Sequence, residues 1–263
     1  MKKNAFTYLL ICLCAFLLSA CCCGFGTSGI ERARIRSYVV AFGEPTAFRM
    51  RLTDNNNIAL YWGENTRWVN FRSEGVEGVR YDELATQYND LSYNRRTRFS
   101  GRPRGRSFVS NGIVSINVVS DTDFGAEYPA GTSLAHFVHL LSASPIRFIE
   151  SGYQETFDWN NNRPAIFLRE TPTFDRLIGA GDEGRILYQN HFPVSGVLSE
   201  LVPDDFRLLG TGRDNYLPSG GWNWLFGFLV FDKEPENLGT HNLTVTIYRT
   251  NGQVLSQTIE KTF

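Results

Sequence analysis

Cysteine is missing from most of this sequence. All five cysteines lie within the first 23 residues, at Cys12, Cys14, Cys21, Cys22 and Cys23. The chain beyond them therefore forms no disulfide, and its hydrophobic core alone must provide the stability that such bridges give many exported proteins. Cys22 and Cys23 do not indicate a metal site either, because no further cysteine or histidine follows nearby.

Lysine is also scarce. Of the 26 lysines and arginines, only Lys2, Lys3, Lys233 and Lys261 are lysines, and arginine is better suited to planar contacts with carboxylates, phosphates and aromatic rings. The formal net charge of −1 is close to neutral. A near-neutral chain gives no reason to expect a nucleic acid as a partner.

Common catalytic motifs are absent. The sequence contains no G-x-S-x-G elbow, no H-E-x-x-H pair and no P-loop, and the body offers no cysteine nucleophile. We therefore expect a protein that is not an enzyme and needs no cofactor. A carbohydrate-active hydrolase of the envelope is the alternative, because a fold can bring together two acids that are distant in sequence.

No apolar run at the amino terminus is long enough to cross a bilayer. The run from Ala5 to Leu18 is shorter than the roughly 20 residues that a spanning helix requires. It follows Lys2 and Lys3 and leads into Leu18-Ser19-Ala20-Cys21, which is typical of a bacterial lipoprotein signal peptide. The pattern predicts cleavage before Cys21 and acylation of its thiol, for example with palmitate.

This interpretation divides the chain into three parts. Residues 1–20 are the signal peptide, residues 21–30 are a flexible, glycine-rich tether, and residues 31–263 form a β-rich domain. Matches to G-x-G-x-x-G at Gly24 and at Gly179 do not indicate a dinucleotide site, because neither stands between a strand and a helix.

Alternating apolar residues predict the strands. Arg32 to Val39 alternates, and Phe48 to Leu52 should pair with Ile58 to Trp62 in a hairpin that places Leu52 opposite Ile58. The closing residues predict a second hairpin around Gly252, with Ile247 opposite Leu255 and Leu243 opposite Ile259.

The intervening residues favour an all-β fold with little helix. Ile113 to Val119 predicts a strand, and Trp222 to Phe231 predicts an aromatic core strand. Short apolar runs at 146–149, 165–168 and 186–188 also suit strands, whereas Tyr81 to Asn89 predicts a short helix. We expect an immunoglobulin-like β-sandwich with long loops and one or two short helices.

The most distinctive stretch is Ser120-Asp121-Thr122-Asp123-Phe124, followed by Pro129-Ala130-Gly131-Thr132-Ser133-Leu134. Ser133 is expected to cap a helix that extends to about Leu141. This segment resembles a family of uncharacterised Bacteroidetes lipoproteins, and the resemblance implies lipidation and a β-rich body without supplying an activity. It also implies the outer membrane, with the periplasmic face favoured because no acidic residue directly follows Cys21.

Several side chains are candidates for binding. Six arginines lie between Asn94 and Arg106 with no acid among them, so Arg95, Arg96, Arg98 and Arg102 could contact an anionic glycan, a lipopolysaccharide phosphate or an envelope protein. Exposed tryptophans could stack on sugars, with Trp222, Trp224 and Trp62 as the first to test.

Metal binding is only weakly indicated. Asp121 and Asp123 could contribute to a calcium site, but turn hydrogen bonds explain the same pair more simply. His136 and His139 would share a face of the expected helix, yet two ligands do not make a zinc site.

Overall fold

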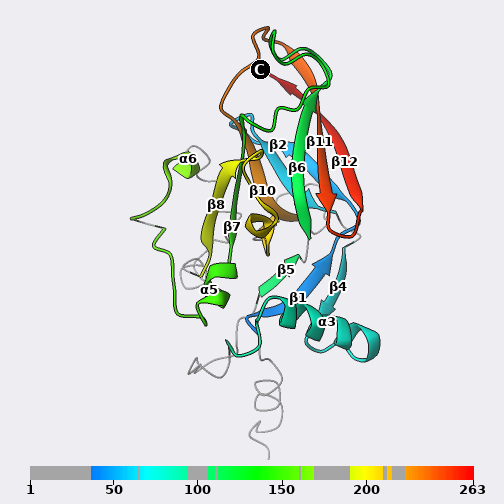
Figure 1. Ribbon diagram of the computed structural model, residues 1–263, viewed down its shortest axis with the longest axis vertical. Helices are drawn as coiled ribbons and strands as arrows, with labels where there is room; N and C mark the ends of the chain where they lie inside the picture. Colours follow the sequence, from blue (N-terminus) through cyan, green and yellow to red (C-terminus); the bar gives the residue numbers. More distant parts are fainter. Residues whose placement is uncertain are drawn as a thin grey trace, which may run out of the picture.

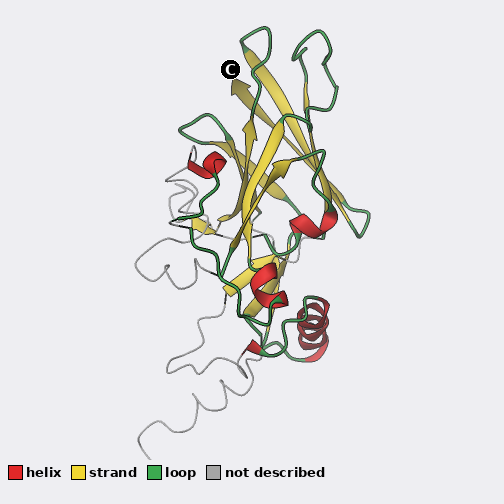
Figure 2. Cartoon of the chain, turned by 60° about the vertical axis from the view of Figure 1, so that its left-hand side comes forward, coloured by secondary structure: helices red, strands yellow, loops and turns green. Residues whose placement is uncertain are grey.

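The computed structural model describes residues 37–63, 66–93, 106–109, 112–159, 161–168, 190–209, 212–214 and 223–263 (Figure 1). Most of its regular structure is strand: β1 (Val39–Glu44), β2 (Phe48–Leu52), β3 (Ile58–Trp62), β4 (Arg67–Asn70), β5 (Arg106–Val109), β6 (Ile113–Ser120), β7 (Val138–Ser144), β8 (Phe192–Val197), β9 (Gly212–Asp214), β10 (Asn223–Phe231), β11 (Thr240–Arg249) and β12 (Val254–Thr262). The described helices are short, namely α3 (Gly75–Gln87), α5 (Ile146–Glu150), α6 (Ala165–Leu168) and the 3-10 turn η1 (Pro203–Phe206). The all-β class with minor helix is confirmed (Figure 2).

The large sheet has the strand order β2-β3-β10-β7-β8, with β9 pairing with β10. Its first hairpin has the register that the sequence predicts, since Leu52 lies opposite Ile58 and Phe48 lies opposite Trp62. The alternation of apolar residues fixes this register, because a slip by one residue would turn every apolar side chain away from the core.

The C-terminal sheet has the order β12-β11-β6. Its hairpin also agrees with the prediction, with Ile247 opposite Leu255 and Leu243 opposite Ile259. Gly252 in the turn has a φ of 79°, in the left-handed region that favours glycine.

The large and C-terminal sheets share one buried core. Phe48, Leu60 and Trp62 of the large sheet belong to the same hydrophobic cluster as Val245 and Ile247 of the C-terminal sheet. The arrangement is sandwich-like, but this strand order does not establish an immunoglobulin-like topology. The opposite face of the large sheet packs a second cluster that includes Trp159 and Phe167.

A small sheet with the order β4-β1-β5 lies below the sandwich in Figure 1 and packs against α3. The helix predicted for Tyr81 to Asn89 is confirmed, but it begins earlier, at Gly75, and ends at Gln87. Its buried residues are Tyr81, Leu84 and Ala85, so the first turn carries no amphipathic pattern that would reveal it. Asn89 has a φ of 54°, which ends the helical path.

Three predictions of local structure are wrong. The runs at 146–149 and 165–168 form the helices α5 and α6, because apolar runs of four residues suit a buried helix turn as well as a strand. Ser133 does not cap a helix to Leu141. Instead, the amide of Leu134 donates a hydrogen bond to the carbonyl of Val118, and β7 follows from Val138.

Two further strand predictions extend beyond the described residues. The strand predicted from Arg32 overlaps the described residues only at its end, where β1 begins at Val39, and the run at 186–188 lies outside them. No described helix is long and apolar enough to cross a membrane.

Candidate functional site

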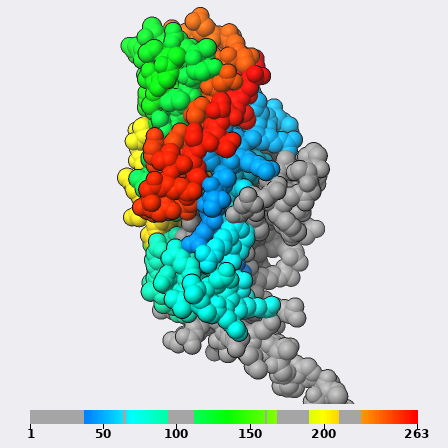
Figure 3. Space-filling model, turned by 90° about the vertical axis from the view of Figure 1, so that its right-hand side faces the viewer, coloured from blue at the N-terminus to red at the C-terminus, as the bar shows by residue number. Residues whose placement is uncertain are grey.

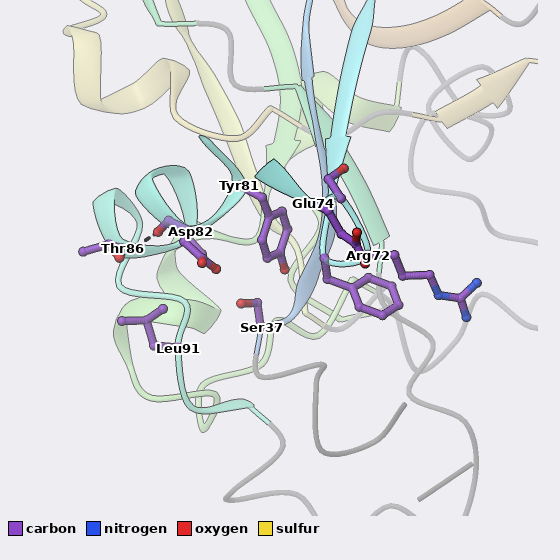
Figure 4. Close-up of a pocket in the computed structure, with 10 residues that line it drawn as sticks. Ser37, Arg72, Glu74, Tyr81, Asp82, Thr86 and Leu91 are labelled. Carbon is purple, nitrogen blue, oxygen red and sulfur yellow. Dashed lines mark hydrogen bonds between the residues drawn. The ribbon is translucent and has the colours of Figure 1, made fainter. Parts of the chain in front are cut away.

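A cleft of about 580 Å³ opens beside α3, between the start of β1 and the loop that joins β4 to α3 (Figure 4). We call it the α3 cleft. Residues from four short stretches line it: Ser37, Phe71, Arg72, Ser73, Glu74, Tyr81, Asp82, Ala85, Thr86 and Leu91. Its position follows from α3, whose buried edge packs on the small sheet while its neighbouring edge remains open.

The inner wall of the α3 cleft is fixed by hydrogen bonds. The hydroxyl of Tyr81 donates to the carbonyl oxygen of Val39 at 2.7 Å, which ties the helix to the first strand. Burial raises the pKa of Tyr81, and the charge of Asp90 acts in the same direction. The Tyr81 hydroxyl therefore stays protonated and remains a hydrogen-bond donor at physiological pH.

Asp90, in the turn after α3, also binds the start of β1. Its two carboxylate oxygens accept hydrogen bonds from the amides of Tyr38 and Val39, both at 2.7 Å, and Tyr153 donates a third at 2.9 Å. Asp90 is fully buried. Burial raises its pKa to about 6, although the three hydrogen bonds oppose this shift.

Among its described lining residues, the α3 cleft carries more negative than positive charge. Glu74 and Asp82 contribute carboxylates, Arg72 contributes one guanidinium, and no ion pair joins Glu74 or Asp82 to another described residue. Figure 4 shows Ser37, Tyr81 and Asp82 around one part of the space, while the guanidinium of Arg72 points away from them. The guanidinium carbon of Arg72 lies 5.2 Å from the ring centre of Phe71.

The α3 cleft has a mixed polar and apolar lining. Its described lining residues contribute hydroxyls, carboxylates, one guanidinium, two aromatic rings and apolar Ala85 and Leu91, but no histidine or cysteine. Such a surface offers hydrogen bonds to a polar ligand.

Most of the site residues predicted from the sequence lie outside the part of the chain that the structure describes. Cys21, Trp222 and the four arginines Arg95, Arg96, Arg98 and Arg102 lie outside the described residues. The backbone of Trp224 lies in β10, where it pairs with Trp62.

The prediction that Trp62 could be exposed for sugar stacking is wrong. Trp62 is fully buried, and its ring stacks on Phe226 with 4.1 Å between centroids. This position in the core leaves no ring face for a sugar.

The two aspartates of the distinctive segment form structural hydrogen bonds. Asp121 accepts hydrogen bonds from the backbone and side-chain amides of Asn242, at 2.8 and 2.7 Å, which lower its pKa. Asp123 accepts one from the amide of Ala130 at 2.7 Å. These bonds join β6 to β11 and close the turn that follows β6.

The two histidines are not on a helix. His139 lies in β7 and bonds to Asp232, whereas the ring of His136 lies beside that of Tyr128. The described residues contain no group of three or more metal-binding side chains.

Aromatic rings and both body lysines gather at the end of the sandwich opposite α3. The amine of Lys261 lies 4.3 Å from the ring centre of Phe263 and donates to the carbonyl of Asn56. The amine of Lys233 lies 5.2 Å from the ring centre of Tyr128. Burial lowers the pKa of Lys261. Each amine thus has a structural contact at this end.

Sequence reasoning missed the α3 cleft, because its lining comes from stretches with no common pattern. One partial signal was available in Asp90, the single acid in the stretch from Tyr88 to Tyr93. A buried acid of this kind often marks an organised site.

Comparisons of the chain with protein-family models, with curated proteins and with solved structures find no match. The fold and the site together define an all-β protein with one small sheet, a covering helix and a polar cleft beside it.

Proposed function

We propose that this chain is a lipid-anchored protein of the cell envelope that binds a polar ligand in the α3 cleft. The signal pattern that ends at Cys21 supports the anchor, and the sequence favours the periplasmic face of the outer membrane. The observation that carries the binding role is the lining of the α3 cleft, where hydroxyls and two carboxylates face a ligand-sized space.

The charge of the α3 cleft narrows the class of ligand. Two carboxylates against one guanidinium favour a neutral or amine-bearing molecule, and the hydroxyls and Phe71 suit a glycan that carries amino groups. Asp82 is the residue that we expect to pair with such an amine.

A glycan array tests this role. Neutral, amino-bearing and acidic glycans are compared on the wild type, on Asp82→Asn and on Asp54→Asn, a matched exposed aspartate in the β2–β3 turn. We expect amino-bearing glycans to bind best, and Asp82→Asn to weaken binding about tenfold, equivalent to about 1.4 kcal/mol. Binding that is unaffected by Asp82→Asn contradicts the proposal.

Acidic glycans provide the contrast. If they bind best and Arg98→Ala abolishes the binding, the arginine-rich stretch is the binding site instead of the α3 cleft. An envelope protein partner would leave the array blank and appear as a co-purified complex.

A hydrolase of envelope carbohydrate is the second candidate. One observation favours it, since Glu74 and Asp82 line the same cleft and glycosidases use a pair of acids. Release of new reducing ends from a bound glycan, lost in both Glu74→Gln and Asp82→Asn, would establish this activity.

A further inference from the structure

The first five residues of α3 expose two valines to solvent. Val76 and Val79 are 81% and 60% exposed, and they lie three residues apart, so they share a helix face that points away from the buried Tyr81 and Ala85. Leu91, just beyond the helix, is 41% exposed and also lines the α3 cleft. Two valines this exposed on one helix face form a small apolar surface that a contact would remove from water.

The charges beside these valines are largely paired. Arg67 lies 3.6 Å from Glu77, and Arg80 lies 3.1 Å from Glu83 and 2.8 Å from Glu44. Glu74 and Asp82, which line the α3 cleft, remain outside these pairs.

The chain enters the described structure beside this helix. Ser37 is the first described residue, and Tyr81 and Asp90 fix the strand start that follows it to α3 and to the turn after α3. From Cys21 to Ser37 the chain spans at most about 55 Å when fully extended. In Figures 1 and 3 the start of β1, in blue, and α3, in cyan, lie at the lower end of the described molecule.

The stretch that holds the six arginines starts and ends at the same place. Tyr93, its last described neighbour on one side, contacts Tyr38 with 5.2 Å between ring centres. On the other side Arg106 pairs with Val39 in the parallel β1–β5 ladder. Two long pieces of chain thus depart from one end of the molecule, and one of them leads to the proposed anchor.

We propose that the α3 face formed by Val76 and Val79 rests on the bilayer that holds the lipid anchor. This inference depends on the proposed lipidation of Cys21. The anchor keeps the end of the molecule that carries α3 near the lipid, and the exposed valines then lose their contact with water at the headgroup boundary. The α3 cleft, which lies along the same helix, opens next to the membrane surface.

The test places a fluorescent reporter on single introduced cysteines. Because the body has no cysteine, Val79→Cys is combined with Cys22→Ser and Cys23→Ser, and the lipidated protein is reconstituted in vesicles of phosphatidylethanolamine and phosphatidylglycerol. Brominated lipids then quench a reporter that touches the bilayer. The matched control is Leu238→Cys, which is 67% exposed in the β10–β11 loop at the opposite end of the molecule.

We expect quenching at position 79 to exceed that at position 238 at least threefold, and Val76→Asp to reduce this ratio. If the reporters at positions 79 and 238 are quenched equally in protein labelled with metabolic palmitate, the proposed membrane contact is wrong. The lipid anchor is then still supported by the palmitate label. Absence of palmitate from the wild-type chain overturns the anchor and the membrane contact together, while binding in the α3 cleft stays measurable on the glycan array.

Discussion

Asp90 gives the sharpest test of how the small sheet and α3 are held together. In Asp90→Asn the amide oxygen can still accept one backbone hydrogen bond, but the amide nitrogen faces the second buried N–H group. Each buried donor left without a partner costs about 1–3 kcal/mol. The same substitution also removes a buried negative charge, which destabilises the folded wild type at neutral pH. The size of that destabilisation follows from the rise in the pKa of Asp90 from 3.8 to about 6.

The lost hydrogen bond and the removed charge together make the effect of Asp90→Asn on the free energy of unfolding depend on pH. The folded pKa of Asp90 lies above the unfolded value, so the folded state holds the proton more tightly and the carboxyl favours folding most below about pH 4. As the pH rises from 4 to about 6, this contribution falls by about 3 kcal/mol, and above that it stays constant. We expect Asp90→Asn to destabilise the protein strongly at pH 4 and only weakly at pH 7.

Urea unfolding at pH 4, 5.5 and 7 measures this difference directly. Asp54→Asn, at an exposed turn, serves as the control and should change the free energy of unfolding by less than about 0.5 kcal/mol at each pH. If wild type and Asp90→Asn lose stability in parallel across this range, the pKa of Asp90 is not raised and the reasoning is refuted.

Three further substitutions test the packing. Trp62→Ala should cost about 3–5 kcal/mol in urea unfolding, because it removes a fully buried ring that stacks on Phe226; a loss below 1 kcal/mol would contradict its position in the core. Gly252→Ala should cost about 1–2 kcal/mol through its positive φ alone, since nothing lies within 4 Å of the added carbon; an unchanged midpoint would exclude that φ. Lys261→Met should cost less than about 1 kcal/mol, because a buried amine is replaced by an apolar chain of similar length; a larger loss in thermal unfolding would show that its bond to Asn56 dominates.

The two hairpins were predictable to the residue, because their registers depend only on local alternation and turn length. The pairs Phe48–Trp62 and Ile247–Leu255 lie where these two rules place them. The turn after β6 was not predictable in the same way. Ser133 bonds to Asn117, and Leu134 bonds to Val118, so neighbouring strand residues replace the helix cap that the local sequence favours.

The α3 cleft depends on contacts that no local rule contains. Ser37 and Asp82 are 45 positions apart in the sequence. They line the same cleft because hydrogen bonds from Tyr81 and to Asp90 hold the start of β1 against the helix. The sequence predicted α3 only from Tyr81, its seventh residue, because Val76 and Val79 before it are exposed where a soluble helix normally has polar residues.

The placement of the two lysines has a practical consequence. Lys261 is almost inaccessible, whereas Lys233 is exposed, so a reagent that acylates primary amines should modify the body chiefly at one position. Biotin attached in this way would immobilise every molecule by the same end. The surface around α3 would then point into solution, where its binding to ligands or liposomes can be measured in a uniform orientation.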